Sequence, residues 1–246
     1  MTGRIVLSVG MPRAGSGWYY NLTHDLLLAA GFSDARLIRQ RFRLQNILTE
    51  VNLNIGALTA RRLLLVAIPA LLGNTFAIKA HAGPTSLAGY SFRLGLIQPT
   101  YIYRDPRDAL LSAYEYGQRA RQDNHDNAFA RLTTVEQALD FIKEYVSISE
   151  AWLECPAALH VRYENLLKNY EEEVDRLLSF LKLDASQPAV RCVIDKYHPD
   201  RERSDQKGLH RAKGKIGRFR EAFTAGQKQQ FIHEFGDYLE RMHYPL

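Results

Sequence analysis

RIVLSVGMPRAGSGW, residues 4–18, is the stretch of sequence that decides the fold. Its first part, 4–10, is almost wholly apolar and predicts a buried strand. The second part, 11–18, contains one proline and two glycines, which mark a turn. Apolar residues then recur with helical spacing from 19 to 30. We therefore expect a strand, a glycine-bearing loop and a helix whose N-terminus faces that loop.

Such a loop favours anion binding, because backbone N–H groups gather at the positive end of the helix dipole. Arg13 adds a fixed charge with forked donors suited to phosphate or sulfate oxygens. The loop is not a Walker A motif. Gly10 and Gly15 have the required separation, but Ser16 and Gly17 stand where that motif has Lys and then Ser or Thr. The residues predict an anion site without the parts for Mg-ATP chemistry, and an ordinary strand-to-helix turn is the alternative.

The bulk composition is that of an ordinary soluble globular protein, with 46% hydrophobic and 24% charged residues. A length of 246 residues suits a single domain, and we expect one over 1–246 with a mainly helical insertion at about 35–72. The net charge is +5, and residues 201–220 contain eight Lys/Arg against two acidic residues. No nucleic-acid module is recognisable, so a solvated face or an anionic small-molecule pocket is the preferred interpretation of that cluster.

The cysteines and histidines of the sequence indicate neither a metal site nor a set of disulfide bonds. Cys155 and Cys192 cannot form a zinc site by themselves, and the histidines show no ligand spacing, so we assign no metal. With no signal peptide, this favours a reducing cytoplasm. The most apolar run, LLLVAIPALL at 63–72, is about half the ~20 residues needed to span a bilayer. We expect a buried helix with a proline bend there; an acceptor-pocket wall or a membrane-surface contact are the alternatives.

Strand and helix patterns alternate along the chain, which implies a parallel sheet with helices on both faces. The expected strands are 4–10, 75–79, 99–103 and 158–161; the expected helices are 19–30, most of 35–72, 106–119, 135–153, 170–183, 188–196 and 227–238. Pro106 suits the first turn of its helix, with Asp105 as the cap. The polar stretch 118–133 and the charged stretch 198–217 are expected to be loops.

Conspicuous polar residues follow each expected strand. Arg13 lies after the first, Lys79 and His81 end the second, Arg104 follows the third and Tyr163 the fourth. In parallel sheets, ligands bind beyond the carboxyl ends of the strands. Each of these residues alone has a structural explanation, but their common position predicts that they converge on one site.

At these positions the sequence resembles the sulfotransferases that use 3′-phosphoadenosine 5′-phosphosulfate (PAPS), especially the cytosolic type and its bacterial relatives. Residues 12–18 (PRAGSGW) resemble the family's 5′-phosphosulfate loop, usually PKSGTTW. The run 103–108 (YRDPRD), continued to Ser112 and Tyr114, resembles the 3′-phosphate motif. Lys79-Ala80-His81 is similar to the family's Lys-x-His, 163–166 (YENL) to Tyr-Glu-Asp-Leu, and 213–224 to the late Gly-x-x-Gly…Phe-Thr loop.

The resemblance implies a P-loop-like three-layer α/β sandwich, with a central parallel sheet flanked by helices, and a role for each matching residue. His81 would be the catalytic base, Lys79 would neutralise the sulfuryl oxygens, and Arg13 would stabilise the leaving oxygen. The donor-binding residues implied are Arg13, Ala14, Gly15, Ser16, Gly17 and Trp18 at the 5′ end, Arg104 and Ser112 at the 3′-phosphate, Tyr163 at the adenine, and Arg211, Lys213 and Gly214 in the closing loop. The resemblance also implies that the Trp18 ring stacks on the purine, with core packing as the alternative.

The sequence also departs from the family pattern. Arg13 replaces the loop Lys, and Gly17 replaces a Thr, which removes one hydroxyl donor. Aligning the late glycines puts Ala212 at the position of the family's Arg, with Arg211 one residue earlier, and Arg218 and Phe219 replace the usual Asp-Trp.

We therefore predict sulfuryl transfer from PAPS, with PAP (3′-phosphoadenosine 5′-phosphate) as product, to a hydroxyl of a small-molecule or lipid-like acceptor. No metal, nucleic-acid partner or stable membrane insertion is expected. The alternatives are a P-loop kinase or other nucleotide-binding enzyme, and a non-catalytic module that binds anions or nucleic acid. The sequence indicates neither the acceptor's identity nor the oligomeric state.

Overall fold

Four parallel strands form the centre of the computed structural model, which describes residues 2–201 and 214–246. They are β1 (Ile5–Gly10), β2 (Phe76–Ala80), β3 (Ile97–Tyr103) and β4 (Leu159–Arg162), in the order β2-β1-β3-β4. All six residues of β1 are buried, because it lies inside the sheet and both of its faces are covered. The apolar run at the N-terminus is therefore the core strand that its composition predicts.

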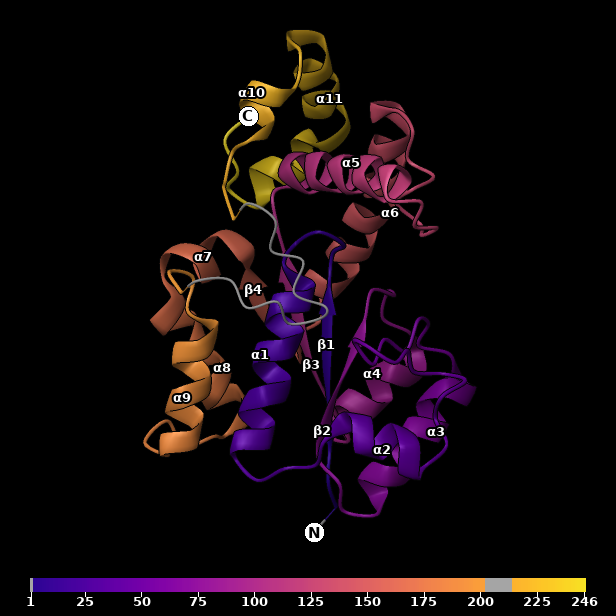
Figure 1. Ribbon diagram of the computed structural model, residues 1–246, viewed down its shortest axis with the longest axis vertical. Coiled ribbons are helices and arrows are strands. Elements are labelled where there is room, and N and C mark those ends of the chain that lie inside the picture. The colour runs from indigo at the N-terminus through magenta and orange to yellow at the C-terminus, as the bar shows by residue number, and fades with distance from the viewer. Residues whose placement is uncertain (1, 202–213) are drawn as a thin grey trace.

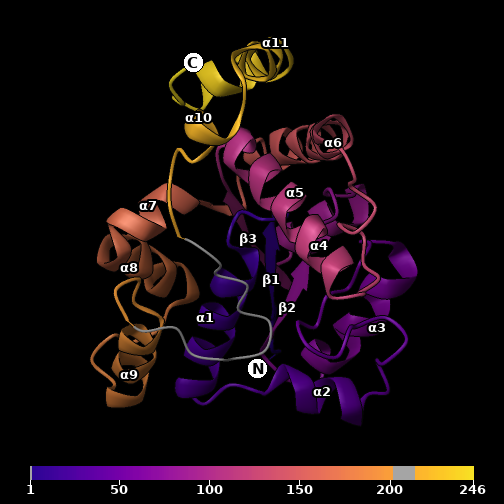
Figure 2. The same ribbon diagram turned by 45° about the horizontal axis from the view of Figure 1, so that its top comes forward.

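Helices cover both faces of the sheet, which gives the three-layer P-loop-like sandwich (Figure 1). One face carries α1 (Ser16–Ala29), α8 (Tyr170–Leu181) and α9 (Pro188–Tyr197); the other carries α2 (Ala35–Arg41), α3 (Ala60–Leu71), α4 (Ser86–Arg93) and α6 (Val135–Leu153). The remaining described helices are α5 (Pro106–Gln122), α7 (Tyr163–Lys168), α10 (Phe219–Ala222) and α11 (Ala225–Arg241). Of these, α5, α10 and α11 lie beyond the carboxyl ends of the strands (Figures 1 and 2).

The strand order opens a crevice at one edge of the sheet. The chain leaves β1 through α1 on one face, and it leaves β3 towards α6 on the opposite face. Connections that diverge from adjacent parallel strands create a switch point, where the loops part and a ligand can bind. The loop carrying Arg13 and the loop carrying Arg104 flank this point.

A second apolar cluster anchors the loop after β1 from above. Met11 and Ala14 are fully buried there, together with Leu110 of α5, Ile142 of α6 and Phe231 of α11. Burial of side chains on both sides of Arg13 fixes the course of the loop, since moving the loop would expose apolar surface to water. The C-terminal helices thus support the site from the side opposite the sheet.

Several boundaries differ from those predicted from the sequence. Helix α1 begins at Ser16, three residues earlier than expected, and α5 continues to Gln122. Helices occupy only the two ends of 35–72, because 42–59 runs past β2 and forms a bridge from Asn54 to Lys79. The short helices α4, α7 and α10 were not predicted, since each has too few turns to produce a clear period.

The buried helix predicted at 63–72 is present, but it is buried along one side only. Helix α3 does contain Pro69, and it packs on the sheet through Leu63, Val66 and Ala70. Its outer side is open, and Leu64 and Leu71 are 64% and 58% exposed. A helix in an outer layer can bury only one stripe, however apolar its sequence is. No helix in the described ranges has the length and apolar character needed to cross a bilayer.

Candidate active site

A cavity of about 330 Å³ lies at the carboxyl ends of the strands. Residues of α5 and of the N-terminus of α1 line it. Figure 2 turns this end of the molecule towards the viewer. Most residues predicted for the site line this cavity: Arg13, Gly15, Ser16, Gly17, Trp18, Lys79, His81, Arg104, Ser112, Tyr163 and Gly214. The structure thus brings together residues from the ends of all four strands.

Two residues in the left-handed conformation, on either side of Ala14, shape the loop. Arg13 has φ 65° and Gly15 has φ 79°, and the amide of Ala14 donates to the carbonyl of Met11 at 3.1 Å. A Cβ at position 15 would lie 2.7 Å from the ring of Tyr163, so only glycine fits there. Ala14, predicted to bind the donor, is fully buried and is not among the residues that line the cavity. It anchors the loop instead.

The N-terminus of α1 opens into the cavity. Gly15 is its N-cap, and no side chain among the described residues caps it. Amides in the first turn of a helix lack intrahelical acceptors, and the helix dipole makes this end positive. Ser16 and Gly17 contribute two of these amides and line the cavity. This is the arrangement that binds phosphate and sulfate groups in proteins.

Arg13 is held in place by side chains of α5 and of the loop that follows it. Its Nε donates to Ser112 Oγ at 3.1 Å, and its guanidinium carbon lies 4.5 Å from the centre of the Tyr116 ring and 5.7 Å from that of Phe129. Burial lowers the pKa of Arg13 to about 10, and the charge of Arg104 contributes in the same direction. The side chain therefore stays charged at neutral pH. Ser112, predicted to act with Arg104, lines the cavity and accepts this bond from Arg13.

Arg104 joins the loop after β3 to two distant segments. Its guanidinium donates to the carbonyls of Arg13 (3.2 Å) and Lys215 (3.0 Å), and its Nη2 lies 3.4 Å from Asp108 Oδ2. The buried Nε of Arg104 has no hydrogen-bond partner among the described residues. Unsatisfied buried donors are costly, so this one marks a position where a bound acceptor is expected.

Asp108 fixes the segment that follows residue 213. It accepts from the backbone amides of Gly217 (2.6 Å) and Phe219 (3.2 Å), and it lies in the first turn of α5. These bonds hold Gly214 and Lys215 at the cavity wall. Arg211 and Lys213, also predicted to bind the donor, lie outside the described residues.

Lys79 is a buried cation in the cavity wall. It is 6% exposed at the end of β2, and burial lowers the pKa of its amino group to about 8, with the positive charge of Arg13 adding to the effect. Burial disfavours the charged form of an amine, and so does a like charge nearby. An anion bound between Lys79 and Arg13 would offset both the cost of burying the charged amine and the repulsion from Arg13.

His81 presents one nitrogen to the protein and keeps the other as an acceptor. Its Nδ1 lies 2.6 Å from the carbonyl oxygen of Gly10. A carbonyl can only accept, so Nδ1 carries the proton and Nε2 carries the lone pair. Burial, together with the positive charge of Lys79, lowers the pKa of His81 to about 4, against the opposing effect of the Gly10 bond. The imidazole is therefore neutral at pH 7 and can accept a proton at Nε2.

The aromatic rings of Trp18 and Tyr163 make most of their contacts with other residues of the protein. Trp18 donates its Nε1–H to the carbonyl of Tyr197 at 3.0 Å, and its ring stacks on Tyr170 with centroids 6.1 Å apart. Tyr163 is 5% exposed, meets Trp18 edge-on and lies under the guanidinium of Arg104 at 4.4 Å. Both residues also line the cavity. An adenine ring bound there would contact the edges of the two aromatic rings that face the cavity.

Eight further residues line the cavity that the sequence did not identify as site residues: Pro12, Thr49, Asn52, Asn54, Glu115, Tyr116, Phe129 and Lys215; Arg218, noted as a departure from the family pattern, is another. The stretches 35–72 and 118–133 supply four of them. Neither stretch has a motif that could have singled these residues out. Lys215 was detectable, because it belongs to the late glycine motif.

The cavity carries an excess of positive charge. Five of its lining residues are basic (Arg13, Lys79, Arg104, Lys215 and Arg218), and Glu115, the acidic lining residue, pairs with Arg218. Within the described ranges, no group of three His, Cys, Asp or Glu side chains could hold a metal ion. The arrangement suits an anion with several negative charges, bound close to a neutral base.

A family profile described as a sulfotransferase domain matches residues 5–243. The chain belongs to the sulfotransferase family. A search of curated protein sequences gave no significant match. Among solved structures, mouse sulfotransferase SULT7A1 complexed with PAP is similar, with a TM-score of 0.61 at 14% identity over 97% of this chain and 85% of that one.

Retinol dehydratase in complex with androsterone and the inactive cofactor PAP also has this fold. Its TM-score is 0.58 at 18% identity, over 96% of this sulfotransferase and 80% of that chain. Retinol dehydratase with retinol and PAP gives 0.55 at 17% identity, over 97% and 82%. At these identities the similarity shows the shared fold.

The lowered pKa of His81 predicts a pH dependence of stability. The imidazole titrates near pH 6.5 in the unfolded chain and near 4 in the folded one, so the unfolded state binds more protons between these values. Stability from this group is present above pH 6.5 and is lost as the pH falls towards 4. Between pH 7 and pH 5 we expect the free energy of unfolding to fall by up to about 2 kcal/mol on account of His81.

Urea unfolding at both pH values, compared with His81→Gln, measures this contribution. The substitution removes the titrating ring, so the difference between the two pH values should shrink by that amount in the variant. Equal pH dependence in both proteins would show that His81 is not held neutral by its surroundings.

Proposed function

We propose that this sulfotransferase transfers a sulfuryl group from PAPS to a hydroxyl group of a small-molecule or lipid-like acceptor, with His81 as the general base. The observation that carries the proposal is the joint lining of one cavity by Arg13, Lys79, Arg104 and a neutral His81. The family, and structural neighbours that were solved with PAP, agree with it.

The cavity fits a ligand with phosphate groups at two separate points. One point is the loop and helix N-terminus at residues 13–17, where Arg13 adds its charge. The other is Arg104, whose buried Nε has no acceptor in the part of the chain that the structure describes. Lys215 lies beside it through its carbonyl bond to Arg104. We assign the 5′ end of the donor to the first point and its 3′-phosphate to the second.

When bound, PAPS supplies a sulfuryl group on a phosphate leaving group. The acceptor oxygen forms a bond to sulfur as the bond from sulfur to the 5′-phosphate oxygen breaks, which leaves a sulfate ester and PAP. The hydroxyl proton passes to Nε2 of His81. The hydrogen bond from Nδ1 to Gly10 holds the ring in the tautomer that this transfer requires.

Lys79 and Arg13 act on the charge that develops during transfer. The leaving oxygen becomes more negative as its bond to sulfur breaks, and Arg13 together with the amides of α1 faces the phosphate. Lys79 neutralises the sulfuryl oxygens. Charge stabilisation of this kind is strong because the groups are already buried and fixed, so little reorganisation is needed. The donor's negative charge would also raise the pKa of His81 and make it a better base.

The acceptor side of the cavity combines aromatic and amide groups. Tyr116 and Phe129 give it an apolar wall, while Thr49, Asn52 and Asn54 give it a polar one. The buried Oδ1 of Asn52 has no hydrogen-bond partner among the described residues, so it can accept from a hydroxyl or amine of the acceptor. A compact alcohol with an apolar body and a further polar group fits this lining.

Selectivity for the donor separates this function from that of a P-loop kinase. We expect PAP without magnesium to raise the midpoint of thermal unfolding, because a ligand selective for the folded state stabilises it by mass action. ATP with magnesium should produce a much smaller shift, since Ser16 and Gly17 replace the Lys and hydroxyl residue of a Walker A loop. A larger shift with Mg-ATP than with PAP would contradict the assignment of the donor, and a larger shift with an oligonucleotide would favour a nucleic-acid-binding module.

Removal of the base should affect turnover and spare donor binding. We expect His81→Ala to lower kcat by about 10²–10⁴-fold, the usual contribution of a general base. The dissociation constant for PAP, measured by calorimetry, should change little, because the side chain faces the acceptor hydroxyl and not the phosphates. Any accepted alcohol, found by mass spectrometry of sulfated products in a metabolite extract, can serve as the substrate.

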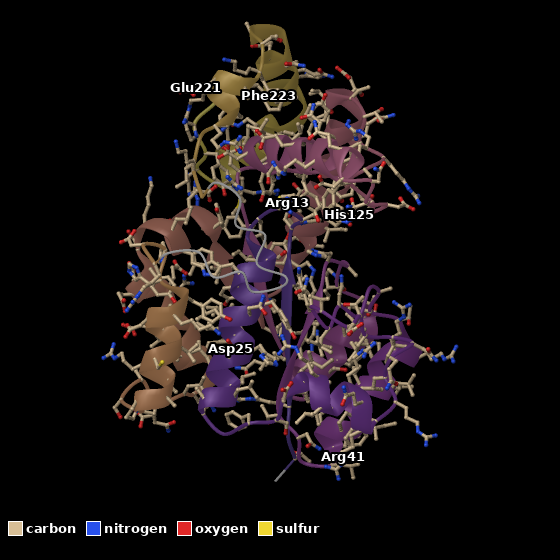
Figure 3. All side chains as sticks on the ribbon, viewed as in Figure 1. Arg13, Asp25, Arg41, His125, Glu221 and Phe223 are labelled. Atoms are coloured by element: carbon tan, nitrogen blue, oxygen red, sulfur yellow. The ribbon has the colours of Figure 1, made fainter. Side chains whose placement is uncertain are left out.

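His125→Ala is the matched control. His125 is exposed and is not among the residues that line the cavity, although it lies at the same end of the molecule (Figure 3). Its loss should leave kcat unchanged. Near-normal turnover in His81→Ala would remove His81 from the role of base, and a parallel loss of PAP binding would make it a donor-binding residue instead.

A further inference from the structure

The exposed apolar side chains of this protein are concentrated on one part of its surface. Of the twelve large hydrophobic residues that are exposed within the described ranges, ten lie between 32 and 94. This segment builds α2, α3 and α4, which lie together on one side of the sheet (Figure 1). Scattered exposed apolar residues are ordinary, but a concentration of this kind marks an interaction surface.

Helix α3 shows the pattern most clearly. Leu64, Ile68 and Leu71 are exposed on successive turns and form a stripe opposite the buried stripe. Leu72 continues the stripe and is 69% exposed. Helix α4 adds a second stripe with Tyr90 and Leu94, the latter 81% exposed; the N-terminal ends of α3 and α4 are joined by a bond from Thr85 Oγ1 to the carbonyl of Leu58.

The same segment is more positively charged than the chain as a whole. Residues 32–94 contain eight Lys/Arg and two acidic residues, Asp34 and Glu50, whereas the other 183 residues contain 24 Lys/Arg and 25 Asp/Glu. Arg41, Arg43, Arg61 and Arg93 are exposed, and no ion pair is formed by these four within the described part of the chain. Arg41 lies at the end of α2, at the lower edge of this layer (Figure 3).

We propose that the outer face of α2, α3 and α4, called the basic apolar face below, docks peripherally on an anionic lipid bilayer. Exposed leucines flanked by arginines suit the boundary between headgroups and acyl chains, where apolar side chains enter the interface and basic ones pair with anionic lipids. This contact needs no membrane-spanning helix.

Charge and composition favour lipid over other occupants. A second copy of this chain would bring two strongly positive faces together, which like-charge repulsion opposes. Nucleic acid would match the arginines but would leave the exposed leucines in water. A bilayer surface with anionic lipids satisfies both groups at once.

The chain connects the basic apolar face to the acceptor side of the cavity. The stretch 42–59, which joins α2 to α3, supplies Thr49, Asn52 and Asn54 to the cavity wall. Docking would therefore bring the acceptor side close to the bilayer, which suits a membrane-dissolved alcohol. This link to the acceptor rests on the proposed function, whereas docking itself does not.

Vesicle co-sedimentation of the full chain, without donor or acceptor, tests the proposal. We expect the chain to bind vesicles of phosphatidylcholine and phosphatidylglycerol, and to bind pure phosphatidylcholine much more weakly. Arg61→Glu with Arg93→Glu should weaken partitioning by about 25-fold or more, at roughly five-fold for each charge near an anionic surface. Leu64→Gln with Leu71→Gln should also weaken partitioning. This loss should persist in high salt, because salt screens the attraction between arginines and anionic lipids but not the contacts of the leucines.

Lys168→Glu with Arg191→Glu is the matched control. It makes the same change in net charge with exposed residues of α7 and α9, away from the basic apolar face. Partitioning of this variant should stay within a few-fold of the unchanged protein, and thermal unfolding checks that all three variants are folded. Equal binding to both kinds of vesicle, or an equal loss in the control, would overturn the proposal. A dimer seen by light scattering without lipid, and dissociated by the leucine substitutions, would assign the face to a second copy.

Discussion

The confinement of three cations in one cavity is the constraint on which the rest of the site depends. Arg13, Lys79 and Arg104 come from the ends of three parallel strands and line the same cavity. Burial lowers the pKa values of Arg13 and Lys79, and the positive charge of a neighbouring arginine adds to the effect in both cases. A bound anion would favour the charged forms of both side chains. The same burial keeps His81 neutral, and a neutral imidazole is the form that can accept a proton. In the proposed function, donor binding and the neutrality of the base would therefore have the same physical origin, the burial of these groups.

Much of the position of the site was predictable from the sequence, because it follows from the parallel arrangement of the strands. In a parallel sheet every strand ends at the same edge, so polar residues that follow apolar runs must lie near one another. This reasoning brought Arg13, His81 and Arg104 to one site, and the structure places all three around the cavity. The cap of α5 by Asp105 was predicted for a similarly local reason, since the carboxylate accepts from the amide of Arg107.

The remaining features depend on contacts between distant segments, which no local pattern encodes. Phe129 reaches Arg13 only because the loop after α5 folds back, and Asn52 reaches the cavity only because 42–59 passes β2. The early start of α1 follows from the left-handed Gly15, whose neighbour Tyr163 is nearly 150 residues away in the sequence. The exposed stripe of α3 was missed because an apolar sequence gives no sign of which side is covered.

A titration of the Lys79 amino group shows whether burial holds its pKa low until an anion binds. Lysine labelled with ¹³C and ¹⁵N, with the signal assigned through Lys79→Arg, reports the pKa of this group with and without PAP. We expect a pKa of about 8 in the free protein, which rises well above that value when PAP binds without magnesium, because the anion favours the charged amine. A pKa that is ordinary in the free protein, or that does not move when PAP binds, would contradict the account.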